Sequence, residues 1–213
     1  MTNYERLLFE TKNEKEYLMN SPIFTLVEKG ELTLDQYLAF LQEAYHHVKY
    51  TVPLLMLSGA NMPFEKEHFR KDIVEYIDEE YGHHEWILND IENTGGDREA
   101  VKQTLPNPAT QAMISYVKDE IHTNPMAFFG MVLVLEGTSV EVATQAAESL
   151  KASLNLTNKS FSYLLSHGSL DLEHIDFFES LINRIDNEDD LNAIIRTAKY
   201  VYIYYSNMFR SIA

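Results

Sequence analysis

The sequence predicts an all-α protein that folds as one single-domain bundle of about seven helices. Glycine and proline are scarce, with eight and six residues in 213, and they fall where helices are expected to begin or end. Apolar residues recur at three-and-four spacing, which places them on one face of a helix. A chain of this length that is 45% hydrophobic can bury its own core. We therefore expect a single domain over residues 1–213.

Two long helices are predicted in the first half of the chain. One covers residues 33–59, because Thr33 can cap it and apolar residues follow at helical spacing. The other covers residues 64–93, and Gly95 and Gly96 directly after it are typical of a C-terminal stop.

The second half is predicted to contain at least four more helical segments. Asn107 can cap a helix over residues 108–122, and Asn124 with Pro125 begins another that reaches about residue 152. Apolar residues between 161 and 182 indicate one kinked helix or two abutting helices that join at Gly168. The last helix is expected over residues 188–211.

Composition excludes several functional classes. The formal net charge is −16 and is spread along the chain, which argues against nucleic acid and anionic membrane surfaces as partners. The absence of cysteine excludes disulfides, thiolate metal sites and cysteine nucleophiles. The N-terminal residues do not resemble a secretory signal, and the longest apolar run, residues 126–134, is about half of the ~20 residues that a membrane span needs. We therefore expect a cytoplasmic protein.

Glu136 is the most unusual acidic residue, because it follows an almost unbroken apolar run. Burying an unpaired carboxylate would cost several kcal/mol, so Glu136 needs a partner. A metal ion would supply one.

A second acidic and imidazole cluster lies near the end of the predicted helix 64–93. Glu80 and His83 are three residues apart, and Glu80 and His84 are four apart; either spacing places both side chains on one helical face. This is the Glu-x-x-His arrangement of carboxylate-bridged diiron bundles. The alternative is a solvated acidic face with incidental histidines.

A third cluster consists of His167, Asp171 and His174, which one continuous helix would align. If a helix instead begins after Gly168, Asp171 could be a first-turn anion favoured by the helix dipole. Together the three clusters supply carboxylates and imidazoles, a ligand set that suits ferrous iron, with manganese as a second choice. Residues that could support such ligands are Tyr45, His46, His47, Tyr81 and Asp90, although helix packing is the favoured explanation for each of them.

Several stretches resemble the heme-oxygenase-like diiron oxidases, proteins described as iron-containing redox enzymes. They are residues 80–86, 136–138 and 167–174, together with residues 43–48 and 202–209. The resemblance covers most of the chain. It implies the seven-helix fold of heme oxygenase, with two Fe²⁺ ions per chain in place of a porphyrin.

The resemblance also implies a ligand set and an activity. The ligands would be Glu80, His83, Glu136, His167, Asp171 and His174, with His84 as the alternative to His83. The implied activity is activation of dioxygen to oxidise a small organic substrate, with an external reductant. A homodimer is common for this fold.

Related proteins of the same fold provide the alternatives. Thiaminase II enzymes need a cysteine nucleophile, which this chain lacks. A cofactor-free oxidase that resembles pyrroloquinoline quinone synthase, and a small-molecule-binding bundle without turnover, both remain open. Heme oxygenase needs an axial histidine in its N-terminal part, where this chain has no histidine before His46.

Overall fold

A computed structural model describes residues 1–166 and 175–213. Over these residues the chain is helical, without a strand, and the predicted all-α class is confirmed. The α-helices are α1 (Asn3–Glu10), α2 (Lys12–Met19), α3 (Pro22–Lys29), α4 (Leu34–Val48), α5 (Thr51–Asn61), α6 (Glu67–Glu80), α7 (His83–Asn93), α8 (Arg98–Gln103), α9 (Pro108–Thr123), α10 (Phe128–Leu154), α11 (Ser162–Asn183) and α12 (Glu188–Ile212). Three short 3-10 helices are η1 (Phe64–Lys66), η2 (Pro125–Ala127) and η3 (Asn158–Ser160).

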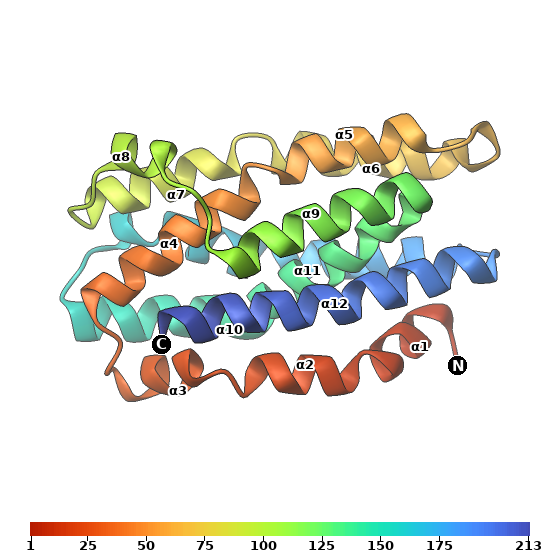
Figure 1. Cartoon of the computed structure of the whole chain (residues 1–213). Helices are drawn as coiled ribbons and strands as arrows, with labels where there is room; N and C mark the ends of the chain where they lie inside the picture. Colours follow the sequence, from red (N-terminus) through yellow and green to blue (C-terminus); the bar gives the residue numbers. More distant parts are fainter.

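The helices stack in layers (Figure 1). The short helices α1, α2 and α3 run along one side of the molecule, next to α12 and α10. On the opposite side α5 and α6 pair with each other, and α4 crosses between the layers to reach α7. At the centre, α10 packs against both α11 and α12.

The expected count of about seven helices is wrong, partly because the predicted helix 33–59 is two helices. The chain leaves the helix after Val48 and α5 begins at Thr51. Pro53 explains the break, because a proline has no N–H to donate and its ring clashes with the carbonyl four residues earlier, which here belongs to Lys49. The N-terminal helices α1 to α3 and the short α8 add further to the count.

The predicted helix 64–93 is also divided, and this break matters for the candidate site. It consists of η1, α6 and α7, with Tyr81 and Gly82 between the two α-helices. Gly82 has φ +95°, a left-handed conformation that side chains rarely adopt. The chain therefore turns between Glu80 and His83, which are not on one continuous helix.

The later predicted helices are confirmed within a few residues. Asn107 caps α9 as expected, since its Oδ1 accepts from the backbone N–H of Thr110 at 2.9 Å. The helices α10 and α12 correspond to the predicted segments 125–152 and 188–211. The segment between residues 161 and 182 belongs to α11, and the predicted join at Gly168 lies outside the described residues.

The central position of α10 follows from its sequence. Every residue from Phe128 to Val134 is buried, and a helix that is apolar on all sides must be covered on all sides. Gly130 allows the close contact with α12, since a Cβ there would lie 2.5 Å from the carbonyl oxygen of Ile194. Among the described residues, the segment Pro125–Leu154 is the one helix long and apolar enough to cross a membrane by length and composition, and most of its apolar part is buried inside the molecule, as in a core helix.

Candidate functional site

Glu80 and His83 meet at the corner between α6 and α7. The Nδ1 atom of His83 lies 3.1 Å from Oε2 of Glu80, and both side chains are largely buried. The His83 ring also stacks on Trp86, with 4.1 Å between the ring centroids. The left-handed turn at Gly82 therefore brings together the pair that the sequence predicted, by a different route from the continuous helix expected.

The corner also separates the two neighbouring histidines. His84 is 40% exposed, and its Nε2 lies 3.6 Å from Oε1 of Glu85 on the surface. His83 is the imidazole that turns inward with Glu80. The predicted alternative of His84 as an inner ligand does not match this arrangement.

Glu136 reaches the same interior space from α10. A cavity of about 50 Å³, here called the carboxylate cavity, has Glu80 and Glu136 in its wall. Most of the remaining wall is apolar and comes from α4, α5, α6, α10 and α11: Val48, Thr51, Leu55, Tyr76, Phe128, Met131, Val132, Leu135, Ser139 and Tyr163. Two acidic side chains from separate helices thus share one largely apolar cavity, as the isolated position of Glu136 in the sequence suggested.

Tyr76 contributes a buried hydroxyl to the carboxylate cavity. The residue is 1% exposed, and its Oη has no hydrogen-bond partner among the described residues. Burial, and secondarily the negative charge of Glu136, raises the pKa of Tyr76 well above its ordinary value, so the group is a neutral phenol. An unpaired buried hydroxyl beside two carboxylates is a feature that a bound group in the cavity would explain.

The donor atoms of this region suit a hard or borderline metal ion. Glu80, Glu136 and His83 supply carboxylate oxygen and imidazole nitrogen, the ligand types that iron and manganese accept. Within residues 1–166 and 175–213, however, no group of three His, Asp or Glu side chains lies close enough to hold a metal. The other predicted ligands, His167, Asp171 and His174, lie outside the described residues.

The predicted supporting residues lie elsewhere. Tyr81 is 77% exposed and does not line the carboxylate cavity. Tyr45 and His46 form a separate group with Lys49, whose Nζ lies 3.1 Å from Nδ1 of His46. His47 packs edge-on against Tyr205, with 5.6 Å between the ring centroids.

Asp90 holds the start of α11. Its Oδ1 accepts from the N–H and the hydroxyl of Ser162, at 2.9 and 2.6 Å, and its Oδ2 accepts from the N–H of Tyr163 at 2.9 Å. Asp90 is fully buried, and these hydrogen bonds offset the loss of its hydration. Asp90 belongs to α7 and caps the start of α11, which is distant in the sequence. The local spacing of residues around Asp90 could not reveal this role.

Sequence reasoning missed three residues that face the carboxylate cavity, Tyr76, Ser139 and Tyr163. A signal existed for two of them. Tyr76 precedes Glu80 by four residues on α6, and Ser139 follows Glu136 by three on α10, so each shares a helical face with a predicted ligand. For Tyr163 the chain offers no comparable spacing.

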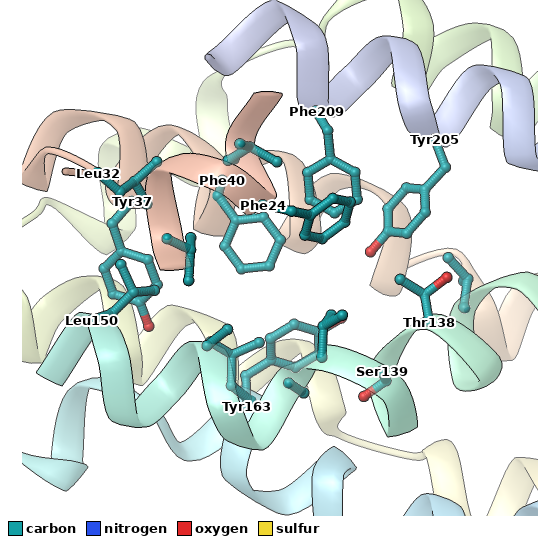
Figure 2. A pocket seen from close by; sticks show the side chains of 17 residues that line it. Phe24, Leu32, Tyr37, Phe40, Thr138, Ser139, Leu150, Tyr163, Tyr205 and Phe209 are labelled. Carbon is teal, nitrogen blue, oxygen red and sulfur yellow. The ribbon is translucent and has the colours of Figure 1, made fainter. Parts of the chain in front are cut away.

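A second cavity adjoins the first. This apolar cavity has a volume of about 70 Å³ and shares Leu135, Ser139 and Tyr163 with the carboxylate cavity. Figure 2 shows its aromatic wall, to which α3, α4, α11 and α12 contribute Phe24, Tyr37, Phe40, Tyr163, Tyr205 and Phe209. The molecule thus places an apolar chamber directly beside the two carboxylates.

Several solved structures share this fold, and they are described as different kinds of protein. A protein of unknown function with a heme oxygenase-like fold from Shewanella denitrificans OS217 is 21% identical, with a TM-score of 0.86 over 100% of this chain and 92% of that one. A TenA homologue from Pseudomonas syringae pv. tomato is 12% identical, with a TM-score of 0.80 over 98% and 91% of the two chains. Heme oxygenase from Leptospira interrogans is 16% identical, with a TM-score of 0.78 over 99% and 100%. At these identities the likeness establishes the heme oxygenase-like fold alone.

The sequence assigns the chain to a narrower group of proteins than the fold does. No curated protein matches it. The sequence pattern of the iron-containing redox enzymes matches residues 38–204, which is most of the chain and contains Glu80, His83 and Glu136. The chain therefore belongs to the family of iron-containing redox enzymes with a heme oxygenase-like fold.

Proposed function

We propose that this protein is a non-heme diiron oxidase that activates dioxygen to oxidise a small organic substrate. The observation that carries the proposal is the shared cavity of Glu80 and Glu136, with His83 against Glu80. Two carboxylates in so apolar a wall would repel each other, and cations between them would offset both the repulsion and the loss of hydration. Membership of the iron-containing redox enzymes favours iron as that cation.

The proposed ligands come from three regions of the chain. Glu80 and His83 would contribute from the corner of α6 and α7, Glu136 from α10, and His167, Asp171 and His174 from the segment between residues 167 and 174. Two bound ferrous ions would supply the electrons that dioxygen takes up, and an external reductant would restore them. Manganese is the second candidate because it accepts the same donors.

The chain's own residues would position the bound ions, shield the reacting atoms from water and supply a proton. Glu80 and Glu136 lie in a wall that Leu55, Met131 and Val132 keep apolar, and this wall would exclude water from the reacting atoms. The phenol of Tyr76 keeps its proton on Oη near the two carboxylates, where it can donate a hydrogen bond.

The test is metal content combined with one nearly isosteric substitution. The protein is expressed with iron, metal per chain is measured by mass spectrometry, and absorbance is followed when the ferrous protein meets oxygen. Two irons per wild-type chain are expected. The variant Glu136→Gln keeps the shape but loses the charge, so it should bind less iron and lose the oxygen-dependent absorbance change.

A matched control lies on the same helix. Glu148 is an exposed residue of α10 whose nearest cation is Lys151 at 4.0 Å, so Glu148→Gln should behave as wild type. If the wild-type chain binds no iron, the diiron proposal fails and a metal-free binding protein or oxidase takes its place. If Glu136→Gln retains full iron content, the assignment of Glu136 is wrong.

A further inference from the structure

The apolar cavity is built without charge. Among the described residues that line it, none is an aspartate, glutamate, lysine, arginine or histidine. The aromatic rings form much of its surface, and Leu32, Leu150 and small residues of α10 complete it. A charged ligand would lose its hydration here without gaining an ion pair.

Hydroxyl groups are the polar side chains of this wall, and two of them are available to a ligand. The hydroxyl of Tyr37 donates to the carbonyl of Ser160 at 2.6 Å, and that of Thr138 donates to the carbonyl of Val134 at 2.6 Å. By contrast, the hydroxyls of Tyr205 and Ser139 make no hydrogen bond to any described residue. In Figure 2 the Tyr205 hydroxyl points into the cavity, towards the α10 turn that carries Thr138 and Ser139.

The available hydroxyls lie at a defined end of the cavity. Ser139 belongs to the wall that the apolar cavity shares with the carboxylate cavity, so this end is the one nearest Glu80 and Glu136. Burial raises the pKa of Tyr205, which therefore remains a neutral phenol and can donate or accept one hydrogen bond. The opposite end, near Tyr37 and Leu150, offers hydrocarbon contacts.

The volume limits the size of the ligand. The two cavities measure about 70 and about 50 Å³. An engineered apolar cavity of ~150 Å³ takes up benzene, and the two cavities here are smaller, so a single ring is the upper limit and a polycyclic molecule or a long chain is too large. The aromatic wall favours a ring as well, because offset and edge-to-face contacts add to the burial of apolar area.

From these features we propose that the substrate of this oxidase is a small uncharged molecule, with one aromatic ring or a hydrocarbon body of similar size and a single hydroxyl-like group held by Tyr205 and Ser139. That this molecule is a substrate rests on the proposed function. That it binds in the apolar cavity does not. Amino acids, carboxylates and amines are disfavoured, because the wall itself carries no charged side chain and the bound ions would offset the charge of Glu80 and Glu136 in the adjoining cavity. The polar end of the ligand lies towards the carboxylate pair.

The experiment compares four ligands of one size on the full-length chain, both metal-free and loaded with iron. The probes are benzyl alcohol, toluene, benzoate and benzylamine, and their dissociation constants are measured by ligand-observed NMR. In the metal-free protein benzyl alcohol should bind at least about tenfold more tightly than benzoate, and in the iron-loaded protein, where the bound cations offset the charge of Glu80 and Glu136, at least about tenfold more tightly than benzylamine. Equal binding of benzoate in the first form, or of benzylamine in the second, would overturn the proposal.

Two variants locate the binding. Ala146 lines the cavity, so Ala146→Phe should fill it and weaken toluene and benzyl alcohol alike, whereas Ala152→Phe makes the same change at an exposed position of α10 and should leave both unchanged. Tyr205→Phe keeps the ring and removes the hydroxyl. It should weaken benzyl alcohol about fivefold and leave toluene unchanged, since one hydrogen bond is lost.

The outcomes separate this proposal from the diiron proposal. Selective binding by a chain that takes up no iron would support the cavity assignment and refute the diiron centre. Two irons per chain, without preference for the uncharged probes or without an effect of Ala146→Phe, would refute the cavity assignment and leave the diiron centre intact.

Discussion

His47 is a buried side chain that makes the fold less stable in acid. It is 1% exposed, and neither ring nitrogen has a partner among the described residues. Burial, with a smaller contribution from the neighbouring His46, lowers the pKa of His47 to about 3. In the unfolded chain the same group titrates near its ordinary value of 6.5. The unfolded state therefore binds more protons between these values, and stability is lost as the pH falls below about 6.5.

We predict that His47→Met flattens this dependence. Methionine is flexible and carries no charge, so it fills the site without proton uptake. Between pH 7.5 and 5 the wild-type protein should lose ~2 kcal/mol more free energy of unfolding than the variant does. Urea unfolding at several pH values measures this, with the same substitution at the exposed His122 as the control. Parallel curves for wild type and His47→Met would contradict the prediction.

Tyr76 permits a second test at the residue scale. Because its hydroxyl has no partner in the described fold, Tyr76→Phe should change the free energy of unfolding by less than ~1 kcal/mol. In the iron-loaded protein the same change should shift the ligand-field spectrum, since the phenol lies beside the proposed ligands Glu80 and Glu136.

Tyr37→Phe is the matched control for this prediction. It removes a buried hydroxyl that donates to Ser160, so it should cost ~1 kcal/mol or more and leave the iron spectrum unchanged. An unchanged spectrum in Tyr76→Phe would show that the Tyr76 phenol does not act on the metal.

At the scale of elements, the corner between α6 and α7 depends on one glycine. Gly82 has room for a Cβ, since nothing lies within 4 Å of one, but its φ of +95° strains any other residue. Gly82→Ala should therefore cost ~1–2 kcal/mol of unfolding free energy. It should also lower iron affinity, because relaxation of the turn moves Glu80 relative to His83. Thermal unfolding and iron titration measure the two effects.

Gly137 provides the opposite case on α10. It also has open space around a Cβ, but it lies in the interior of a helix without a positive φ. Gly137→Ala should therefore stabilise the protein by ~0.5–1 kcal/mol. If both substitutions shift stability in the same direction, backbone conformation is not what distinguishes the two positions.

These elements also show what the sequence could predict. The helices over 108–123 and 188–212 were expected because their caps and apolar spacing are local signals. The breaks at Pro53 and Gly82 also have local causes, yet the prediction placed each of them inside one long helix. Helix periodicity identifies which face is buried, but it is less sensitive to a turn that preserves that face.

For the site, the residues that the fold brings together include those with unusual chemistry in the sequence, whereas contacts decided by packing were not predicted. Glu136 was singled out because an acid in apolar sequence needs a partner, and Glu80 because of its spacing to His83; the two share a cavity. Asp90 and Tyr163 meet only through the fold, from α7 and α11. The roles of His167, Asp171 and His174 remain predictions, since these residues lie outside the described part of the chain.

At the scale of the whole molecule, the proposed ligands come from different elements. The helix α6, which carries Glu80, packs chiefly against α5. Among the ion pairs of the described residues, two join this region to the C-terminal part of the chain: Asp72 with Arg184 at 2.6 Å, and Lys66 of η1 with Asp190 at 2.5 Å. Both lie away from Glu80, at or before the middle of α6. A metal between Glu80 and Glu136 would therefore tie the far end of α6 to the central helix α10.

Metal binding should accordingly stabilise the whole fold and protect α6 in particular. Ferrous iron at about 100 times its dissociation constant adds ~2.7 kcal/mol to the free energy of unfolding, which corresponds to a rise in Tm of about 5–10 °C for a chain of this size. Anaerobic calorimetry with and without iron measures the rise, and amide hydrogen exchange should slow at the end of α6 near Glu80. Glu148→Gln should show the full shift and Glu136→Gln much less of it. A rise in Tm of the same size in Glu136→Gln would place the iron elsewhere in the molecule.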